Sequence, residues 1–264
     1  MGKLASIKKL AKNFFSKEQN IYFLIDLGIL GNEIILSPQF CRNRQNPKIA
    51  KVFEVLLGTD NLMCNVGRAS AMRPTKNIKF PDGSLVDRPN WRTIEEWLHW
   101  DMCPWTGLTT TFSWKVKDLD KNWGYDKVKV QGVLAIVDCS ENDGGFHCVP
   151  GFRHHIRGWA NENLDKFVNT HREAAGSIQV PDDDPIRKDI QKVPIRKGSL
   201  LVWDSSLPHG TFPNNSDKFR MIQYIKMADR ADPSIEPLFN LELLPEDFVL
   251  TPLGKKLMGP QSFT

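Results

Sequence analysis

The segment KGSLLVWDSSLPHGTFPNNSDKFRMIQYI, residues 197–225, contains the pattern that decides the fold. Its apolar runs at 199–203 and 219–227 are of strand length and are bounded by Gly, Pro, Asn and Asp, which favour turns. Comparable runs occur earlier in the chain at 108–114, 128–137 and 145–149. Short strands at this spacing are typical of a β-sandwich or barrel, so the sequence predicts a mainly β fold with flanking α-helices.

Length and composition allow one large globular domain or two small ones, and nothing in the sequence forces a split. The chain has 264 residues, of which 41% are apolar and 25% are charged, the usual mixture of a folded protein with a well-buried core. We expect a single domain over 1–264, with a helical part at 1–60, a β core at 61–227 and a tail at 228–264. The polar residues 160–192 predict an insertion or lid rather than a pair of strands.

Helices are predicted at both ends of the chain. Apolar residues recur at helical spacing in 4–15, Ser16 opens a second helix that ends near Gly28 or Gly31, and residues 47–57 form a third. Near the other end, Thr251 and Pro252 have the types preferred at the cap and first position of a short closing helix. The predicted helices therefore flank the strands.

Charge and cysteine content limit the class of partner. The formal net charge of +4 suggests attraction to anionic small molecules more than a nucleic-acid groove. The five cysteines form no CxxC pair, which predicts free thiols in a reducing compartment. No uninterrupted apolar run suits a signal peptide or a membrane span. We therefore expect a cytoplasmic protein with a small-molecule substrate and neither a nucleic-acid nor a membrane partner.

The tripeptide His99-Trp100-Asp101 predicts part of a metal centre. On an extended segment, His99 and Asp101 share one face while Trp100 points away into packing. His209 begins the extended segment after the strand at 199–203, and together the three match the 2-His-1-carboxylate pattern of non-haem Fe(II) oxygenases. A histidine and an aspartate two apart often occur by chance, and each residue alone suits a turn, a loop or an aromatic patch. Their joint order and strand context favour the metal interpretation.

Arg220 lies eleven residues after His209 and predicts a site for an anion. It shares one face of a predicted strand with Ile222 and Tyr224. An arginine that points into a barrel needs an anion, and a guanidinium offers two parallel donors that match a carboxylate. Thr211, on the face of His209, could add a hydroxyl. The sequence thus predicts a dicarboxylate beside the metal.

Two segments resemble the phytanoyl-CoA dioxygenase family of Fe(II)- and 2-oxoglutarate-dependent oxygenases. They are QGVLAIVDCSENDGGFHCVPGFRH (131–154) and KGSLLVWDSSLPHGTFPNNSDKFR (197–220). The resemblance covers about residues 60–227, and it implies a double-stranded β-helix of the jelly-roll or cupin kind. Phe152 replaces a serine of the family's Pro-Gly-Ser-His segment, and the polar stretch before the second segment is longer than usual. Both departures leave the substrate open.

The resemblance also implies the roles of individual residues. It assigns three ligands to Fe(II): His99, Asp101 and His209. Arg220 and Thr211 would hold the far carboxylate of 2-oxoglutarate, Arg73 would contact the cofactor or substrate in place of the lysine of a Lys-Pro pair, and Trp105 would line the substrate side. Dioxygen is the expected second co-substrate, with ascorbate as a candidate reductant.

The implied reaction is hydroxylation of an unactivated C–H bond of a small organic or acyl substrate, with succinate and CO2 as co-products. Asp101 stands where related halogenases have a small residue that makes room for chloride, so hydroxylation is expected over halogenation, while desaturation and ring closure stay open. A catalytically inactive cupin-like binding or regulatory protein is one alternative, although such proteins usually lack one ligand or the arginine. A nucleic-acid demethylase of the same chemistry is another and would need a basic, aromatic-lined groove.

Overall fold

The structure is a computed structural model that describes residues 27–30, 34, 36–65, 67–94, 97–105, 115–116, 129–163, 177–232, 235–236 and 244–259. The helices predicted at 4–15 and from Ser16, and the strand predicted at 108–114, lie outside these residues, apart from the end of the second helix. The structure therefore tests the predictions for the β core and for the two later helices.

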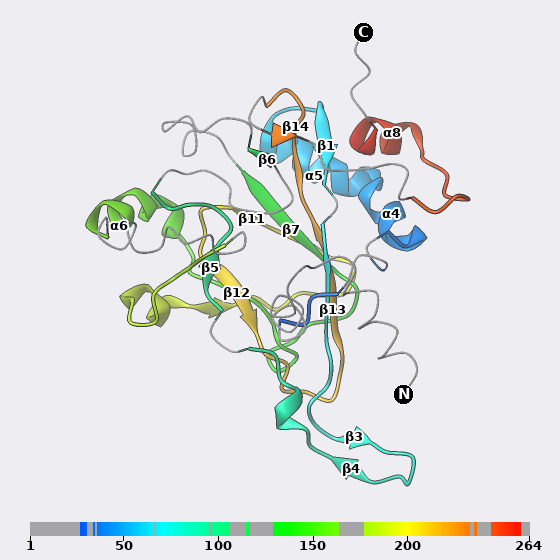
Figure 1. The fold of residues 1–264 in the computed structure, drawn as a ribbon, viewed down its shortest axis with the longest axis vertical. Helices are drawn as coiled ribbons and strands as arrows, with labels where there is room; N and C mark the ends of the chain where they lie inside the picture. Colours follow the sequence, from blue (N-terminus) through cyan, green and yellow to red (C-terminus); the bar gives the residue numbers. More distant parts are fainter. Residues whose placement is uncertain are drawn as a thin grey trace.

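Two antiparallel sheets form the body of the molecule (Figure 1). The four-stranded sheet has the order β11-β7-β13-β2, with β2 at Ala69–Met72, β7 at Val130–Ala135, β11 at Leu200–Asp204 and β13 at Arg220–Ile225. The five-stranded sheet has the order β10-β8-β12-β5-β9, with β5 at His99–Trp100, β8 at Gly145–Cys148, β9 at Ile178–Gln179, β10 at Gln191–Lys192 and β12 at His209–Phe212. The chain is a double-stranded β-helix of the jelly-roll kind, as predicted.

Strand register decides which side chains lie between the sheets. Trp203 of β11 pairs with Gln131 of β7, and Tyr224 of β13 pairs with Val133 of β7. Because side chains alternate along a strand, these residues share the inner face of the four-stranded sheet. The inner side chains of both sheets form one buried cluster: Val133, Ala135, Cys139, Phe146, Cys148, Ile195, Trp203 and Ile222. The core between the sheets therefore lies directly beside the predicted metal ligands.

Helices cover the outer faces of both sheets (Figure 1). The outer face of the four-stranded sheet packs against α5 (Pro47–Leu57) and α8 (Pro252–Met258). Helix α4 (Pro38–Arg44) comes just before α5 in the chain. The Asn46 side chain accepts a hydrogen bond from the Lys48 amide at 2.9 Å, and the Thr251 hydroxyl accepts one from the Gly254 amide at 3.0 Å. These caps confirm the helix predicted at 47–57 and the closing helix at Thr251.

The outer face of the five-stranded sheet packs against an aromatic cluster. Trp100 contacts Phe152 of the 3-10 helix η2 (Phe152–His154) and Trp159 of α6 (Ile156–Glu162), with ring centroids 5.7 Å and 4.7 Å away. Trp100 is fully buried there. The prediction that Trp100 points away from the metal ligands into packing is therefore confirmed.

The segment 160–192, predicted as an insertion or lid, contributes two short strands to the five-stranded sheet, and these two strands do not pair with each other. Strands β9 and β10 complete the two opposite edges of the five-stranded sheet, and η3 (Pro185–Asp189) lies between them in the chain. The Trp159 indole N–H donates to the buried Asp184 carboxylate at 2.8 Å, which ties this segment to α6. Strands of two residues are too short to show a periodic pattern, so sequence analysis could not find them.

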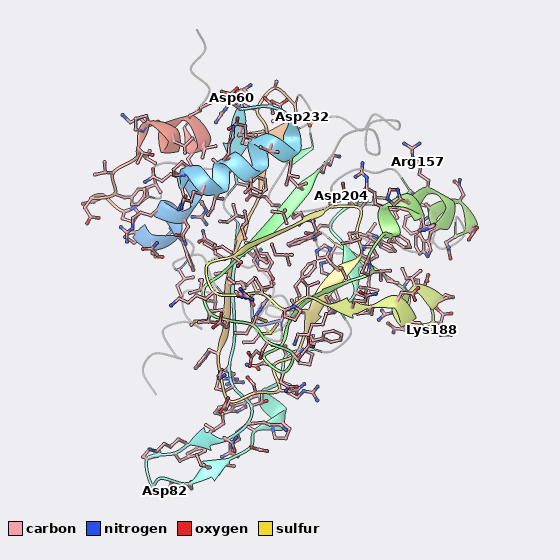
Figure 2. All side chains as sticks on the ribbon, turned by 180° about the vertical axis from the view of Figure 1, so that it is seen from behind. Asp60, Asp82, Arg157, Lys188, Asp204 and Asp232 are labelled. Carbon is pink, nitrogen blue, oxygen red and sulfur yellow. The ribbon has the colours of Figure 1, made fainter. Side chains whose placement is uncertain are left out.

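Three further strand pairs complete the described structure. Strand β1 (Leu62–Cys64) pairs with β14 (Met227–Asp229), and β6 (Lys115–Val116) pairs with β15 (Ile235–Glu236). The hairpin of β3 (Ile78–Lys79) and β4 (Leu85–Val86) follows β2 in the chain, precedes η1 (Pro89–Trp91) and projects from the body, with Asp82 at its tip (Figure 2). Within the described ranges, no helix has the length and apolar character needed to cross a bilayer.

Candidate metal centre

The five-stranded sheet brings the three predicted ligands together. His99 of β5 and His209 of β12 are direct cross-strand partners, with ring centroids 4.6 Å apart. The Asp101 carboxylate lies 3.5 Å from His99 Nε2 through Oδ1 and 3.9 Å from His209 Nε2 through Oδ2. One candidate ligand atom from each residue lies within 4.8 Å of the others. Three atoms this close can bind a single metal ion on one face and leave its other face open.

Backbone carbonyls orient both imidazole rings. His99 Nδ1 lies 3.2 Å from the Trp97 carbonyl oxygen, and His209 Nδ1 lies 2.9 Å from the Leu207 carbonyl oxygen. A proton on each Nδ1 lets the ring donate to that carbonyl, which leaves the Nε2 lone pair directed at the centre. This second contact fixes the tautomer that a metal ligand needs.

The protonation states also suit a cation. Burial lowers the pKa of His209 to about 3, and the nearby His99 adds to this effect, so the ring is neutral near pH 7. Burial alone would raise the pKa of Asp101, but the Lys226 ammonium holds it well below its usual range. The site therefore offers a neutral imidazole at His209 and an ionised carboxylate at Asp101.

Arg220 lies on the inner face of the opposite sheet and is 1% exposed. Its Nη1 donates to the Ser70 hydroxyl at 3.1 Å, and the guanidinium also contacts the Cys139 thiol and the Tyr224 hydroxyl. Its Nε atom is buried without a hydrogen-bond partner in the described part of the chain. A buried guanidinium with an unused donor is suited to bind a carboxylate.

Comparison with known proteins identifies the family. A model of the family Phytanoyl-CoA dioxygenase (PhyH) matches residues 125–222, which include His209 and Arg220. A Dictyostelium discoideum protein named "Putative phytanoyl-CoA dioxygenase" is 30% identical over 207 residues, which cover 73% of this chain and 54% of that protein. The chain belongs to the phytanoyl-CoA dioxygenase family. It spans about half the length of this curated relative.

Solved structures also resemble this phytanoyl-CoA dioxygenase family member. The non-heme monooxygenase ThoJ is 15% identical, with a TM-score of 0.46 over 81% of this chain and 63% of that one. EctD from S. alaskensis, solved with 2-oxoglutarate and 5-hydroxyectoine, is 16% identical, with a TM-score of 0.47 over 80% of this chain and 59% of that one. These likenesses are distant, and both the fold and the site are described from the chain's own geometry.

The other sequence-predicted site residues of this family member lie in different places. Thr211 follows His209 on the inner face of β12, where it pairs with Phe146 of β8. Arg73 is exposed, and its guanidinium lies 4.5 Å from the centre of the Trp91 ring. Trp105 packs against Trp159 in the outer aromatic cluster, with ring centroids 5.6 Å apart. Thr211 therefore faces the metal centre, whereas Arg73 and Trp105 make their described contacts elsewhere.

The centre of this dioxygenase family member contains one charged group that was not predicted from the sequence, Lys226. Lys226 Nζ lies 3.2 Å from Asp101 Oδ2, and the lysine side chain is 13% exposed. Burial lowers the pKa of Lys226, while the charge of Asp101 opposes this shift. Strand β13 ends at Ile225, but the alternation of Arg220, Ile222 and Tyr224 continues to residue 226. Extending this alternation by two residues beyond Tyr224 would have placed Lys226 on the inner face.

Proposed function

We propose that this chain is an Fe(II)- and 2-oxoglutarate-dependent dioxygenase that hydroxylates a C–H bond of a small organic or acyl substrate. The observation that carries the proposal is the triad of His99, Asp101 and His209, whose ligand atoms lie within 4.8 Å of one another. Two nitrogens and one carboxylate oxygen form the donor set expected for non-haem Fe(II). The membership of the phytanoyl-CoA dioxygenase family supports the same chemistry.

The four-stranded sheet would hold the co-substrate. The guanidinium of Arg220 would donate to the far carboxylate of 2-oxoglutarate, and Ser70 fixes the guanidinium by accepting from Nη1. Thr211 faces the same space and would add a hydroxyl. Bound iron and 2-oxoglutarate would supply the activation of dioxygen, with succinate and CO2 as co-products. The chain's own residues orient these reactants and surround them with the apolar side chains between the sheets.

Asp101 favours hydroxylation over halogenation. A carboxylate ligand takes the coordination position that a halogenase leaves for chloride, and the Lys226 ammonium keeps this carboxylate ionised. The protein would thus present three ligands to iron, so the remaining positions serve 2-oxoglutarate and dioxygen. The presence of all three ligands and Arg220 also favours an enzyme over an inactive binding protein of the same fold.

Anaerobic addition of Fe(II) and then 2-oxoglutarate tests this function. We expect the metal-to-ligand charge-transfer absorption of the chelate to appear with the folded protein. His209→Ala should abolish iron binding, because one of three ligands is lost. Arg220→Ala should weaken 2-oxoglutarate binding at least about tenfold while iron binding persists, since a charge-assisted hydrogen bond contributes about 1.5–3 kcal/mol.

The matched control is Arg88→Ala, because Arg88 stacks on Phe80 near the projecting hairpin, with the guanidinium 5.1 Å from the ring centre. It removes the same charge from the chain and should change neither binding constant. No charge-transfer band with folded wild-type protein would exclude the proposed function. Equal effects of His209→Ala and Arg220→Ala on both ligands would contradict the assigned roles.

A further inference from the structure

The space between the sheets contains hydrogen-bond donors to which the proposed function assigns no ligand. They lie on the inner face of the four-stranded sheet and are Arg68, Gln131, Trp203 and Lys226, called here the donor group. Trp203 pairs directly with Gln131, and the pairing of Ile225 with Gly132 places Lys226 opposite Gln131. Side chains opposite each other on one face lie about 5 Å apart, so these residues form a continuous row across three strands.

Two members of the donor group are buried without partners. Gln131 is 3% exposed and Trp203 is 7% exposed, yet Gln131 Nε2 and Trp203 Nε1 have no hydrogen-bond acceptor in the described part of the chain. A buried N–H without an acceptor costs free energy, so the site is suited to a ligand that supplies acceptors. Trp203 also lies near the metal centre, because its ring centroid is 5.0 Å from that of His209.

The other two members add positive charge. An ammonium has three N–H donors, and Lys226 directs one toward Asp101 at 3.2 Å. The Arg68 carbonyl oxygen accepts a hydrogen bond from the Tyr224 backbone N–H. This bond places the two residues opposite each other on the inner face. No carboxylate pairs with the partly buried Arg68 guanidinium among the described residues. The donor group therefore contains a cation without an acidic partner.

The formal charges around the metal centre indicate the class of ligand that the donor group would bind. Iron(II), ionised Asp101, Arg220 and the 2-oxoglutarate dianion together balance to zero. Lys226, whose partner Asp101 is already counted with the iron, and the partly buried Arg68 then remain as positive charges on the same face, and charges withdrawn from water favour a counter-ion. Along β13, Ile222 and Tyr224 lie between Arg220 and Lys226, and Arg68 lies opposite Tyr224, so the co-substrate's far carboxylate and this counter-ion would occupy different ends of the sheet.

We propose that the donor group binds an oxyanion on the primary substrate, which is therefore an organic acid whose acidic group is held beside the iron. This inference deepens the proposed function, because it takes the His99, Asp101 and His209 triad as the reaction centre. The acid anchors the substrate while the C–H bond to be oxidised lies next to the metal. An acceptor-rich group satisfies all the unused donors at once, which a neutral hydrocarbon chain would not.

Acetate binding to metal-free protein tests the anion site independently of iron. All samples carry Arg220→Gln, which removes the predicted co-substrate carboxylate site, and binding is read from the line width of the acetate methyl proton. We expect saturable, millimolar binding that Lys226→Met weakens at least about tenfold, and that Gln131→Leu and Trp203→Phe each weaken several-fold. Lys226→Arg should restore binding, and Lys188→Met, an exposed lysine of η3 (Figure 2), should leave it unchanged.

The same substitutions in the otherwise unchanged Fe(II) and 2-oxoglutarate complex separate the two proposals. Acetate should perturb the charge-transfer band of the wild-type complex, acetamide should not, and Gln131→Leu should keep 2-oxoglutarate affinity within about threefold. A normal band combined with no acetate binding would overturn the anion site and leave the proposed function intact. Acetate binding without any charge-transfer band would overturn the proposed function and leave the anion site intact. A large loss of 2-oxoglutarate affinity in Gln131→Leu would assign the donors to the co-substrate and refute the proposal.

Discussion

Two buried histidines on neighbouring strands have opposite environments. His209 has a carbonyl partner for Nδ1 and directs Nε2 into the metal centre. His147, on β8, is 0% exposed, stacks on Phe212 at 4.4 Å and has no hydrogen-bond partner for either ring nitrogen among the described residues. A buried imidazole without hydrogen-bond partners must stay neutral in the folded protein, whereas it can bind a proton in the unfolded chain. His147 should therefore make the stability of the protein depend on pH.

We predict that His147→Phe removes a loss of stability at acid pH. Burial lowers the pKa of His147 to about 4 from 6.5, so between these values the unfolded chain binds the extra proton and the folded chain does not. The free energy of unfolding is therefore highest above about pH 6.5 and falls as the pH drops toward 4. Urea unfolding from pH 4.5 to 7.5 should show a smaller pH dependence in His147→Phe than in the exposed control His154→Phe. Equal slopes would contradict this assignment.

At the residue scale, alternation along a strand was enough to predict the face on which individual side chains lie. Alternation correctly placed Arg220 on the inner face of β13 and Trp100 on the outer face of β5. It did not identify Lys226, because the predicted inner face was followed only as far as Tyr224. It also could not locate Arg73 or Trp105, since the stacking partners Trp91 and Trp159 depend on tertiary packing.

At the element scale, strand β12 positions His209 through a glycine that permits close approach. A Cβ built on Gly210 would collide with the Trp97 carbonyl oxygen and lie 2.8 Å from the His147 ring. The Trp97 carbonyl lies two residues before β5 and the His147 ring belongs to β8, so neither can move without displacing the strand beside it. Gly210 is therefore required for the spacing that brings His99 and His209 together.

We predict that Gly210→Ala destabilises the fold and abolishes metal binding. Overpacking of a tight core costs about 1–3 kcal/mol or more, and here it would separate the strands that contribute His99 and His209. Gly158→Ala in α6 is the control, because nothing lies within 4 Å of a Cβ there, and it should leave metal binding unchanged. Urea unfolding and Co(II) titration measure both effects. Normal Co(II) affinity in Gly210→Ala would show that the centre tolerates a shift of β12.

The segment around β9 and β10 is anchored by the contact between Trp159 and Asp184. Asp184 also caps η3, because its Oδ1 accepts from the Ile186 amide at 3.1 Å. Asp184→Ala should therefore lower the free energy of unfolding by about 1–3 kcal/mol, since it leaves a buried indole N–H without an acceptor. The exposed Asp183→Ala should have little effect. Similar losses in both variants, measured by urea unfolding, would indicate that the Trp159 contact contributes nothing.

At the scale of the whole molecule, the order of the apolar runs predicted a β-sandwich or barrel, and the resemblance to the phytanoyl-CoA dioxygenase family narrowed this prediction to the jelly roll. Strands β7, β8, β11, β12 and β13 each coincide with a run or motif that the sequence shows, and their alternation sets which face is buried. The pairing of His99 with Gln179 at the edge of the five-stranded sheet was not predictable, because β5 and β9 contain two residues each. Such short strands form through contacts with their neighbours rather than by intrinsic propensity.

The metal centre joins β5 to β12, so metal binding should stabilise the whole fold. An ion that binds only the folded state adds about 2.7 kcal/mol to the free energy of unfolding at a concentration 100 times its Kd. We predict that Co(II) raises the melting temperature of the wild-type protein and has little effect on Asp101→Ala, which lacks the carboxylate ligand. Asp60→Ala removes an exposed carboxylate that pairs with Lys256 at 2.7 Å, and it should retain the full increase. An equal increase in Asp101→Ala, measured by thermal unfolding, would place the stabilising ion outside the centre formed by His99 and His209.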